Sequence, residues 1–496
     1  MISAPATRIR SVLKPRGFAS LLHGTSCLTS KSRGFASLLH DTSSLSSNTP
    51  QFVVGTKNGF LPRQDPLVKL PPSYEILEDL LQRMPLKLKK DGKPGLLATG
   101  GFGDAVHKEL PEYDFSNVHD SHLLTALFRD YTFASSAYLL EPCDIMNRKK
   151  GDYGLGRDKL PRNLAVPLSV VAQKIGAKPF MEYAQSYSLF NWQRKDRHGD
   201  LSYENLDLIR GFAGADSEHG FILVHVAMVA HSGEQVRTTL AALEAVENDS
   251  RTKFNAALSD MLKAFQKING VMDTMWRHSA PADYVKFRTF IMGTKNQPMF
   301  PNGVIYEGVS DQATFYRGES GANDSIIPTA DNFLEITQHL PSNPLTQILR
   351  DFRSYRPSGH NEWVSWVEGK SSQLGVRAYA EKDASSNVLY LAMVDQVREF
   401  RARHWNFTKE YIIKYSAHPV ATGGSPIATW LPNQLAVVLD VMVSSGRKIN
   451  MAALSPEGRE MADELTERAN TQRRVLLREV DNLKTKFKNQ EQLARV

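Results

Sequence analysis

A histidine at position 404 stands within a row of apolar residues at helical spacing. The row consists of Val397, Phe400, His404, Phe407 and Tyr411. These residues share one face of a predicted helix at 389–416, and such a face is directed to the interior. A lone histidine there is most often a core residue, and without a cysteine or carboxylate at metal-ligand spacing it cannot build a zinc site. It can be the single axial ligand of a haem, because the porphyrin provides the other four nitrogens.

Two further side chains with possible chemistry have apolar surroundings. His225 shares a helical face with Phe221 and Met228. It is either a core histidine with a fixed tautomer, or a group that donates a hydrogen bond to oxygen or receives a proton. Arg288 lies between aromatic residues, and a buried arginine needs a carboxylate partner. That partner is either an internal glutamate or the carboxylate of a ligand.

Two loops of small residues follow these segments. In the first, at 316–325, the backbone and the Ser320 hydroxyl can approach a ligand closely, or the loop only caps the next helix. The second, at 421–426, is either a lid after the His404 helix or a plain connection. None of these patterns is specific alone.

Helical periodicity dominates the chain after residue 119. The predicted helices span residues 123–140, 166–175, 203–208, 220–231, 235–246, 252–276, 282–292, 331–339, 345–353 and 389–416. Strand-like alternation is scarce, and proline and glycine gather in the connections. These features predict a mostly α protein rather than one built of β-α-β units.

Composition limits the class of protein. A chain of 496 residues with 41% apolar and 23% charged residues is long enough for two or three globular domains. Its two cysteines, Cys27 and Cys143, exclude a disulfide framework and a cysteine-built zinc or iron–sulfur site. No apolar run reaches the roughly 18–20 residues of a membrane span, so we expect no such span.

The net charge of +7 comes mostly from the first fifty residues. They hold six basic side chains and one acid, which leaves 54 basic and 52 acidic side chains elsewhere. This near-neutral body argues against nucleic acid as a partner. The Arg- and Ser-rich stretch, in which a unit at 16–26 is nearly repeated at 33–43, is typical of a mitochondrial transit peptide. The alternative is an unstructured tail on a cytoplasmic protein.

We therefore predict four parts of the chain. They are a leader at 1–50, an N-terminal arm with a small domain at 51–180, a large helical domain at 181–450, and a charged C-terminal helix at 451–496. Apolar residues recur at helical spacing in the last part, at Leu476, Val480, Leu483 and Phe487. This spacing indicates either one apolar stripe docked on the body or a short coiled-coil contact.

Several segments, taken in order, resemble the indoleamine 2,3-dioxygenase family, which are monomeric haem enzymes that open the indole ring of tryptophan. The segments are residues 160–167, 202–207, 220–224, 304–308, 320–325 and 351–360, His404 with 409–413, and 422–424. The match spans roughly residues 160–432, over half of the chain, and its multi-part order is specific. The resemblance implies a two-domain helical protein whose larger domain binds haem b.

The resemblance also implies a role for each matching residue. His404 matches the proximal ligand of the haem iron, with Asp331 as a carboxylate near that ligand. Arg288 matches the arginine that binds the substrate carboxylate. His225 and Ser320 fall at positions expected to act in catalysis. The other matching positions belong to the substrate pocket and its mobile loop: Phe221, Tyr183, Tyr284, Thr422 and Gly423.

The implied reaction follows from what the family does. Ferrous haem and O2 insert both oxygen atoms across the pyrrole double bond of L-tryptophan and give N-formylkynurenine. This is the first step of tryptophan catabolism by the kynurenine pathway, which leads to NAD biosynthesis. The expected partners are O2 and a small indole amino acid.

The chain departs from the family pattern around the pocket. His225 stands where many members carry a serine, Asp283 and Tyr284 where they carry two phenylalanines, and 318–321 replaces a plainer run of small residues. A distal imidazole can hydrogen-bond oxygen or the indole N–H. It can also narrow the pocket of a non-catalytic haem oxygen-binder, which is the alternative function. A haem-free interaction protein with Arg288 paired internally is the third hypothesis.

Overall fold

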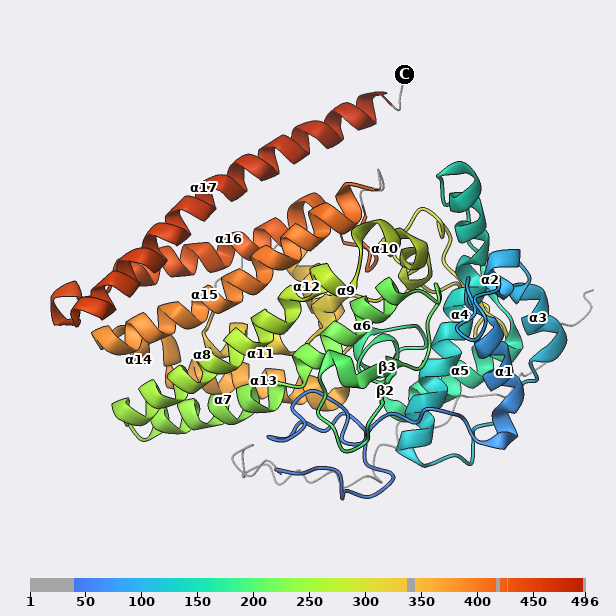
Figure 1. Ribbon diagram of the computed structural model, residues 1–496, viewed down its shortest axis with the longest axis horizontal. Coiled ribbons are helices and arrows are strands. Elements are labelled where there is room, and N and C mark those ends of the chain that lie inside the picture. Colours follow the sequence, from blue (N-terminus) through green and yellow to red (C-terminus); the bar gives the residue numbers. More distant parts are fainter. Residues whose placement is uncertain (1–39, 337–343, 416–419, 426, 494–496) are drawn as a thin grey trace, which may run out of the picture. The chain divides into compact units, whose positions relative to one another are not determined.

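The computed structural model of the chain is built mainly of helices (Figure 1), and it describes residues 40–336, 344–415, 420–425 and 427–493. The fold is mostly α, as predicted, while the division into a small and a large domain stays a prediction. The predicted leader lies outside the described residues up to residue 39. The α-helices are α1 (Glu75–Arg83), α2 (Leu96–Thr99), α3 (Phe102–Glu109), α4 (Ser121–Lys150), α5 (Arg162–Ile175), α6 (Asp216–Val229), α7 (Ser232–Glu247), α8 (Arg251–Asp273), α9 (Met275–His278), α10 (Pro281–Arg288), α11 (Ile326–Phe333), α12 (Pro344–Arg353), α13 (Ser358–Leu374), α14 (Val376–Glu381), α15 (Ala384–Phe407), α16 (Ile427–Gly446) and α17 (Pro456–Leu493).

Strands are few and short in the described part of the chain. β1 (Lys159–Leu160) pairs in parallel with β4 (Ile305–Tyr306), and β2 (Trp192–Arg194) pairs in antiparallel fashion with β3 (Leu206–Leu208). These short pairs join segments that are distant in sequence, and the helices supply the rest of the core.

The secondary structure differs from the prediction at one wrongly predicted helix and at helices that the sequence did not reveal. The predicted helix at 203–208 is wrong, because the segment is a short 3-10 turn followed by β3. Its two leucines are buried and Asp207 between them is half-buried, which is the period of two of a strand. Helices α13 and α16 were not predicted. Pro432, inside α16, removes a backbone donor and is a usual helix breaker, so it hid that helix.

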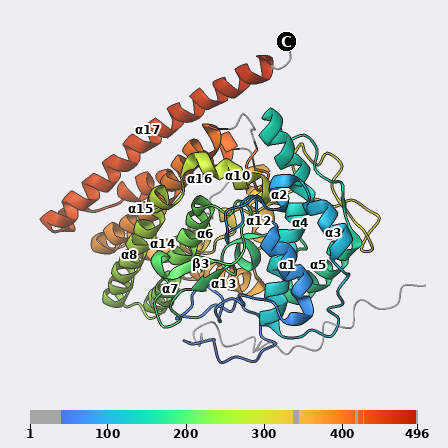
Figure 2. The same cartoon turned by 45° about the vertical axis from the view of Figure 1, so that its right-hand side comes forward.

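The second half of the chain forms a row of long helices. Helices α7, α8, α15, α16 and α17 pack against one another in that order. Two views agree that α15 and α16 lie side by side with α17 beyond them (Figures 1 and 2). In the N-terminal half, α4 is almost fully buried from Leu124 to Leu140 and packs against α5.

Helix α15 carries His404 three residues before its last residue. Its N-terminus is capped by Asp383, whose side chain accepts a hydrogen bond from the backbone N–H of Ser386. Beyond Phe407 the chain continues as a π-helical turn over Thr408–Ile413. The predicted helix at 389–416 is thus confirmed as far as residue 413. Turns of this kind are rare and occur often at functional sites.

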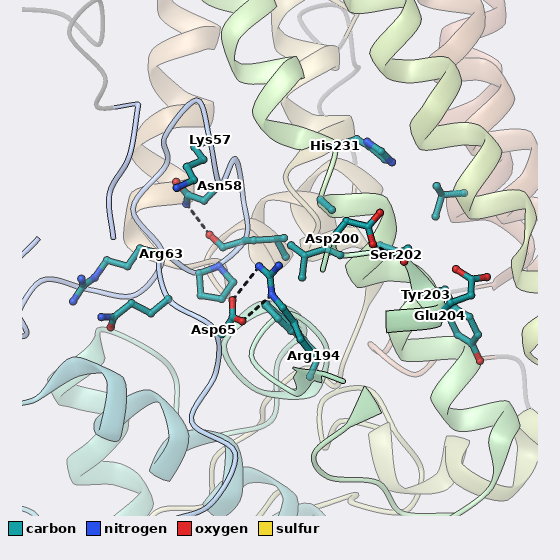
Figure 3. Close-up of a pocket in the computed structure, with 18 of the residues that line it drawn as sticks. Lys57, Asn58, Arg63, Asp65, Arg194, Asp200, Ser202, Tyr203, Glu204 and His231 are labelled. Atoms are coloured by element: carbon teal, nitrogen blue, oxygen red, sulfur yellow. Dashed lines mark hydrogen bonds and ion pairs between the residues drawn. The ribbon is translucent and has the colours of Figure 1, made fainter. Parts of the chain in front are cut away.

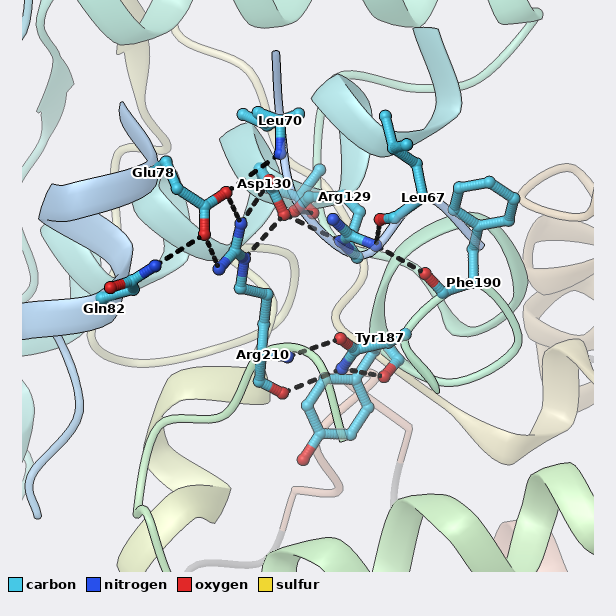
Figure 4. Close-up of polar contacts among 11 residues, drawn as sticks. Leu67, Leu70, Glu78, Gln82, Arg129, Asp130, Tyr187, Phe190 and Arg210 are labelled. Atoms are coloured by element: carbon cyan, nitrogen blue, oxygen red, sulfur yellow. Dashed lines mark hydrogen bonds and ion pairs between the residues drawn. The ribbon is translucent and has the colours of Figure 1, made fainter. Parts of the chain in front are cut away.

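A network of buried charges connects α1, α4 and the segment after β3 (Figure 4). The Arg210 guanidinium donates to Glu78 at 2.5 Å and to Asp130 at 2.9 Å, and Arg129 donates to Asp130 at 2.7 Å. Burial would raise the pKa of Glu78 and of Asp130, but the arginines outweigh it, so both pKa values are lowered and both groups are ionised. Arg210 therefore balances two buried carboxylates at once.

Removing this arginine is expected to destabilise the fold strongly. In Arg210→Met the charge of Glu78 and part of that of Asp130 are left uncompensated, so the free energy of unfolding should fall by about 3–5 kcal/mol. Urea unfolding at neutral pH measures the loss. The matched control is Arg194→Met, which breaks a more exposed pair with Asp65 and should cost less than about 1 kcal/mol. Equal losses in the two variants would contradict the assigned role.

The C-terminal helix α17 lies on α15 and α16, which is the first of the two arrangements that its apolar spacing left open. Its buried side chains include Ala462, Leu465, Ala469 and Leu476, and Val480 is half-buried. The side chains of Leu483 and Phe487 lie outside the described residues. Glu479 accepts from Trp405 Nε1 at 3.0 Å and from Lys409 Nζ at 3.1 Å. The stripe thus docks on the body of the same chain.

Candidate active site

A cavity of about 860 Å³, including the solvent at its mouth, opens between α6, α10, α15 and two loops. Its wall is formed by Phe221, His225, Met272, Met275, Tyr284, Glu319, Ser320, Gly321, His404, Phe407, Thr408, Tyr411, Ile412, Ala421, Thr422, Ser425, Trp430 and Leu431. Six of the residues predicted for the site lie on this wall: Phe221, His225, Tyr284, Ser320, His404 and Thr422. Segments almost two hundred residues apart in sequence therefore meet here.

His404 presents an imidazole to this cavity. Neither ring nitrogen has a hydrogen-bond partner in the described part of the chain, whereas its backbone carbonyl accepts from Thr408. Burial, together with nearby His225 and Arg401, lowers the pKa of His404 to about 4, so the ring is neutral at pH 7. A neutral imidazole with a free nitrogen is a good iron ligand.

The other groups on the wall fit a porphyrin better than a bare metal ion. No cluster of three or more histidine, cysteine, aspartate or glutamate side chains that could hold a metal occurs within residues 40–336, 344–415, 420–425 and 427–493. Large apolar side chains surround His404 instead, among them Met272, Met275, Phe407 and Trp430. The two imidazoles of the wall, His404 and His225, come without a third ligand side chain, which suits a cofactor that brings nitrogen ligands of its own.

Asp331 lies close to the His404 helix but does not hydrogen-bond the imidazole. Its Oδ2 accepts from Arg401 Nη2 at 2.6 Å, and Arg401 precedes His404 by about one turn on α15. Asp331 is thus connected to the His404 helix through Arg401. The direct carboxylate–imidazole contact that the resemblance suggested is absent among the described residues.

His225 faces the same cavity from α6, in a defined tautomer. Its Nδ1 lies 2.7 Å from the carbonyl oxygen of Phe221. Because a carbonyl oxygen only accepts, Nδ1 carries the proton and Nε2 is a hydrogen-bond acceptor. Burial lowers the pKa of His225 to about 4, so the ring stays neutral at pH 7.

Aromatic rings surround His225. Phe221 lies 5.3 Å from it and Tyr183 lies 5.9 Å from it, both edge to face, measured between ring centroids. Phe221 also lies 5.2 Å from the ring of Tyr284. Tyr183 is fully buried behind the wall, in a π-helical turn (Tyr183–Tyr187). These rings make this side of the cavity aromatic, which suits an aromatic ligand.

Arg288 ends α10, one turn after Tyr284, and is completely buried. Its Nη2 donates to the carbonyl oxygen of Val420 at 3.0 Å, while Nε and Nη1 have no partner. None of the described carboxylates forms an ion pair with it, so the internal glutamate that the sequence left open is not found there. A buried guanidinium with two unused donors is suited to bind the carboxylate of a ligand.

The loop at 420–425 is held against the cavity by its backbone. Gly293 N–H donates to the carbonyl oxygen of Thr422 at 3.0 Å, and Arg317 Nη1 donates to that of Gly423 at 3.0 Å. The side chains of Thr422 and Tyr284 are hydrogen-bonded to each other. At Gly318 a Cβ atom would lie 2.6 Å from the Thr422 oxygen, so only glycine permits this approach.

Sequence reasoning missed several residues of the wall. Met272 and Met275 belong to α8 and α9, and Trp430 and Leu431 to α16. Glu319 was noticed only as an unusual residue in a loop. Helical spacing could not reveal these positions, because their meeting depends on how distant helices pack.

A second, larger cavity of about 2030 Å³, including open solvent, contains none of the predicted site residues (Figure 3). Its charged side chains are partly paired with each other, as in Arg194 with Asp65 at 2.8 Å and Lys57 with Asp41 at 2.5 Å. His231 and His278 lie on its wall, but without the apolar setting of His404. The first cavity therefore remains the candidate active site.

Comparison with known proteins agrees with the geometry. The family described as indoleamine 2,3-dioxygenase matches residues 48–443. The chain belongs to this family. It is similar to indoleamine 2,3-dioxygenase 1 of Rattus norvegicus, with 27% identity over 71% of this chain and 81% of the relative. It is also similar to indoleamine 2,3-dioxygenase 2 of Homo sapiens, with 30% identity over 52% of this chain and 62% of the relative.

A fungal relative is similar to this chain at a lower sequence identity. Indoleamine 2,3-dioxygenase of Saccharomyces cerevisiae is 24% identical over 73% of this chain and 80% of its own length. Membership of the indoleamine 2,3-dioxygenase family identifies the chain as an oxidoreductase of the haem-dependent dioxygenase type. Within the described residues, no helix is long and apolar enough to cross a membrane.

Proposed function

We propose that the chain is a haem-dependent dioxygenase that converts L-tryptophan and O2 to N-formylkynurenine. The observation that carries the proposal is Arg288, whose Nε and Nη1 have no partner. Arg288 is not itself on the wall that carries His404, but it stands one turn after the wall residue Tyr284 and donates to Val420, the neighbour of the wall residue Ala421. Arg288 suits the carboxylate of a ligand, and the aromatic side chains Phe221 and Tyr284 suit a flat ring at the other end of that ligand.

His404 would hold the haem iron through its neutral imidazole. When bound, the haem iron supplies the activation of O2 that opening of an indole ring requires. The remaining residues position the substrate and exclude water. Arg288 binds the carboxylate, the rings of Phe221 and Tyr284 contact the indole, and the 420–425 loop covers the amino-acid end.

His225 has a specific task in this arrangement. Its Nε2 is an acceptor, so it can bind the N–H of an indole ring and fix the orientation of the ring in the cavity. In this tautomer it cannot donate a hydrogen bond to oxygen. That favours a role in orienting substrate over the alternative of a non-catalytic oxygen-binder, in which a distal imidazole would serve as a donor.

Replacing His225 is expected to weaken the use of substrates that carry a ring N–H. His225→Phe keeps an aromatic side chain but removes the acceptor, and one neutral hydrogen bond is worth about 1 kcal/mol, so kcat/KM for tryptophan should fall about 5–10-fold. The benzofuran analogue of tryptophan, which lacks the N–H, provides the control. If His225→Phe lowers kcat/KM equally for both compounds, the hydrogen bond is not the reason.

The proposed function itself is tested with purified, reduced haem protein. Mixed with L-tryptophan and air-saturated buffer, it should produce N-formylkynurenine, followed by absorbance and by mass spectrometry. A protein that binds haem and oxygen but forms no product would contradict the proposal and support the oxygen-binder. The mitochondrial leader at 1–50 and a monomeric state remain predictions.

A further inference from the structure

Glu319 is a buried acid on the cavity wall for which the reaction proposed above gives no task. The residue is 4% exposed, and its carboxyl has no hydrogen bond or ion pair in the described part of the chain. A polar group that is buried and unpaired is costly, which calls for a reason to retain it.

The backbone of Glu319 is tied to the segment that follows Arg288. Its N–H donates to the carbonyl oxygen of Ile291 at 3.1 Å. Ile291 ends a short 3-10 turn that begins directly after Arg288, the last residue of α10. Glu319 is therefore fixed next to the element that carries the arginine assigned to the substrate carboxylate.

The residues on both sides of Glu319 pack on the loop at 420–425. A Cβ atom at Gly318 would lie 2.6 Å from the carbonyl oxygen of Thr422, and one at Gly423 would lie 3.2 Å from the Cβ of Ser320. Glu319, Ser320 and Thr422 also lie on the same cavity wall. Because this loop covers the amino-acid end of the substrate in the arrangement proposed above, Glu319 belongs to that end.

The charged groups at this end of the cavity complement an α-amino acid. Arg288 has two unused donors for a carboxylate. Arg317, two residues before Glu319, is already engaged, because it pairs with Asp351 at 2.7 Å and donates to the carbonyl oxygen of Gly423 at 3.0 Å. An α-amino acid brings the missing cation, since its ammonium group lies one carbon atom away from the carboxylate that Arg288 binds.

A cation beside Glu319 would change its ionisation. Burial, together with the charge of Glu182, raises the pKa of Glu319 to about 8, so its carboxyl is mostly protonated at pH 7. A neighbouring cation lowers the pKa of a carboxyl, so a bound ammonium group should displace this proton. Burial lowers the pKa of histidines and raises that of tyrosines, which keeps the other titratable side chains of the wall neutral at pH 7: His225, His404, Tyr284 and Tyr411.

We propose that Glu319 is a specificity-determining residue that binds the ammonium group of the substrate, so that the site selects α-amino acids over indole acids that lack the amine. This inference rests on the proposed function and assigns one further residue to the same site. A hydrogen bond between charged groups is stronger than a neutral one, and a ligand that leaves the buried carboxyl unpaired is discriminated against.

The test uses the full-length haem protein, reduced and kept under nitrogen so that ligands bind without turnover. L-Tryptophan and indole-3-propionate, which lacks the amine, are titrated by calorimetry at pH 7 in buffers that differ in ionisation enthalpy. Wild-type protein should bind tryptophan about 10–100-fold more tightly than indole-3-propionate. About one proton should be released per tryptophan bound, and none per indole-3-propionate bound.

Two variants of Glu319 separate its charge from its shape. Glu319→Gln keeps the size of the side chain but removes the charge, so it should lower the preference for tryptophan at least about fivefold and abolish the proton release, with unchanged affinity for indole-3-propionate. Glu319→Asp keeps the charge on a shorter side chain and should retain part of the preference. The matched control is Glu362→Gln, which neutralises an exposed glutamate on α13 and should change neither quantity. Retention of the haem absorption band shows that each variant is folded.

Several results would overturn the inference. A wild-type protein that binds both ligands equally, or that releases no proton on binding tryptophan, does so even if the variants fail to fold. So does an undiminished preference in Glu319→Gln, or a variant that loses haem while it retains the preference, which would assign Glu319 to the cofactor. In each of these cases, turnover of tryptophan by the wild-type protein leaves the proposed function intact. Absence of haem binding or of N-formylkynurenine overturns the proposed function itself.

Discussion

His404→Ala is expected to abolish haem binding. Loss of the imidazole removes the ring that we assign to the iron, while the other histidine of the wall, His225, is fixed on α6 by its Nδ1 bond to Phe221 and is assigned to the substrate. The Soret band of the purified variant should disappear, with the haem content per chain near zero. Far-ultraviolet circular dichroism should remain helical, because the rest of α15 is held by its own packing.

Two controls make this result specific to ligation. His231→Ala removes a half-buried histidine of the other cavity and should leave the haem content unchanged. Free imidazole added to His404→Ala should restore part of the absorption band, since it can occupy the space of the missing side chain. An intact Soret band in His404→Ala would show that another residue holds the iron.

Arg288→Met is expected to have the largest effect on turnover among the substrate-binding residues. Methionine fills much of the buried space but cannot pair with a carboxylate. Truncating one partner of a buried charge pair costs about 3–4 kcal/mol, so kcat/KM for tryptophan should fall about 10²–10³-fold. Most of the loss should appear in KM, because the carboxylate is bound before and during the reaction.

Tryptamine, which lacks the carboxylate, is the matched control for Arg288→Met. Wild-type and variant proteins should use tryptamine equally poorly, so that the gap between them closes. Arg288→Lys should recover only part of the tryptophan activity, because an ammonium group cannot form the two parallel bonds of a guanidinium. A loss of the same size on tryptamine would mean that Arg288 has a structural role.

The spacing of apolar residues correctly predicted those features that depend on one helix alone. The row around His404 was correctly assigned to one face of a helix, and Phe221 and His225 were found on one face of α6. The mostly α fold followed in the same way. Roles within the pocket came from family resemblance, and the structure brings most of those residues to one cavity.

Contacts between side chains of different helices and loops depend on tertiary packing, and the sequence did not reveal them. Spacing along a helix cannot show that Met272 and Trp430 meet across the cavity, or that Asp331 pairs with Arg401 instead of the histidine. The state of Glu319 was equally hidden, because its burial and lack of partners arise from neighbours in other segments. The short strand β3 was mistaken for a helix because a period of two over only three residues is too short to be distinguished from a helical pattern in the sequence.

Helix α17 lies beyond the region that matches the family, and it contacts the end of the helix that carries His404. The family match ends at residue 443, yet Glu479 binds Trp405 and Lys409, which stand immediately after and five residues after His404. A segment outside the matched region therefore holds the end of the helix that carries His404. Shortening the chain before Glu479 would remove these two contacts and leave Trp405 Nε1 and Lys409 Nζ without this acceptor.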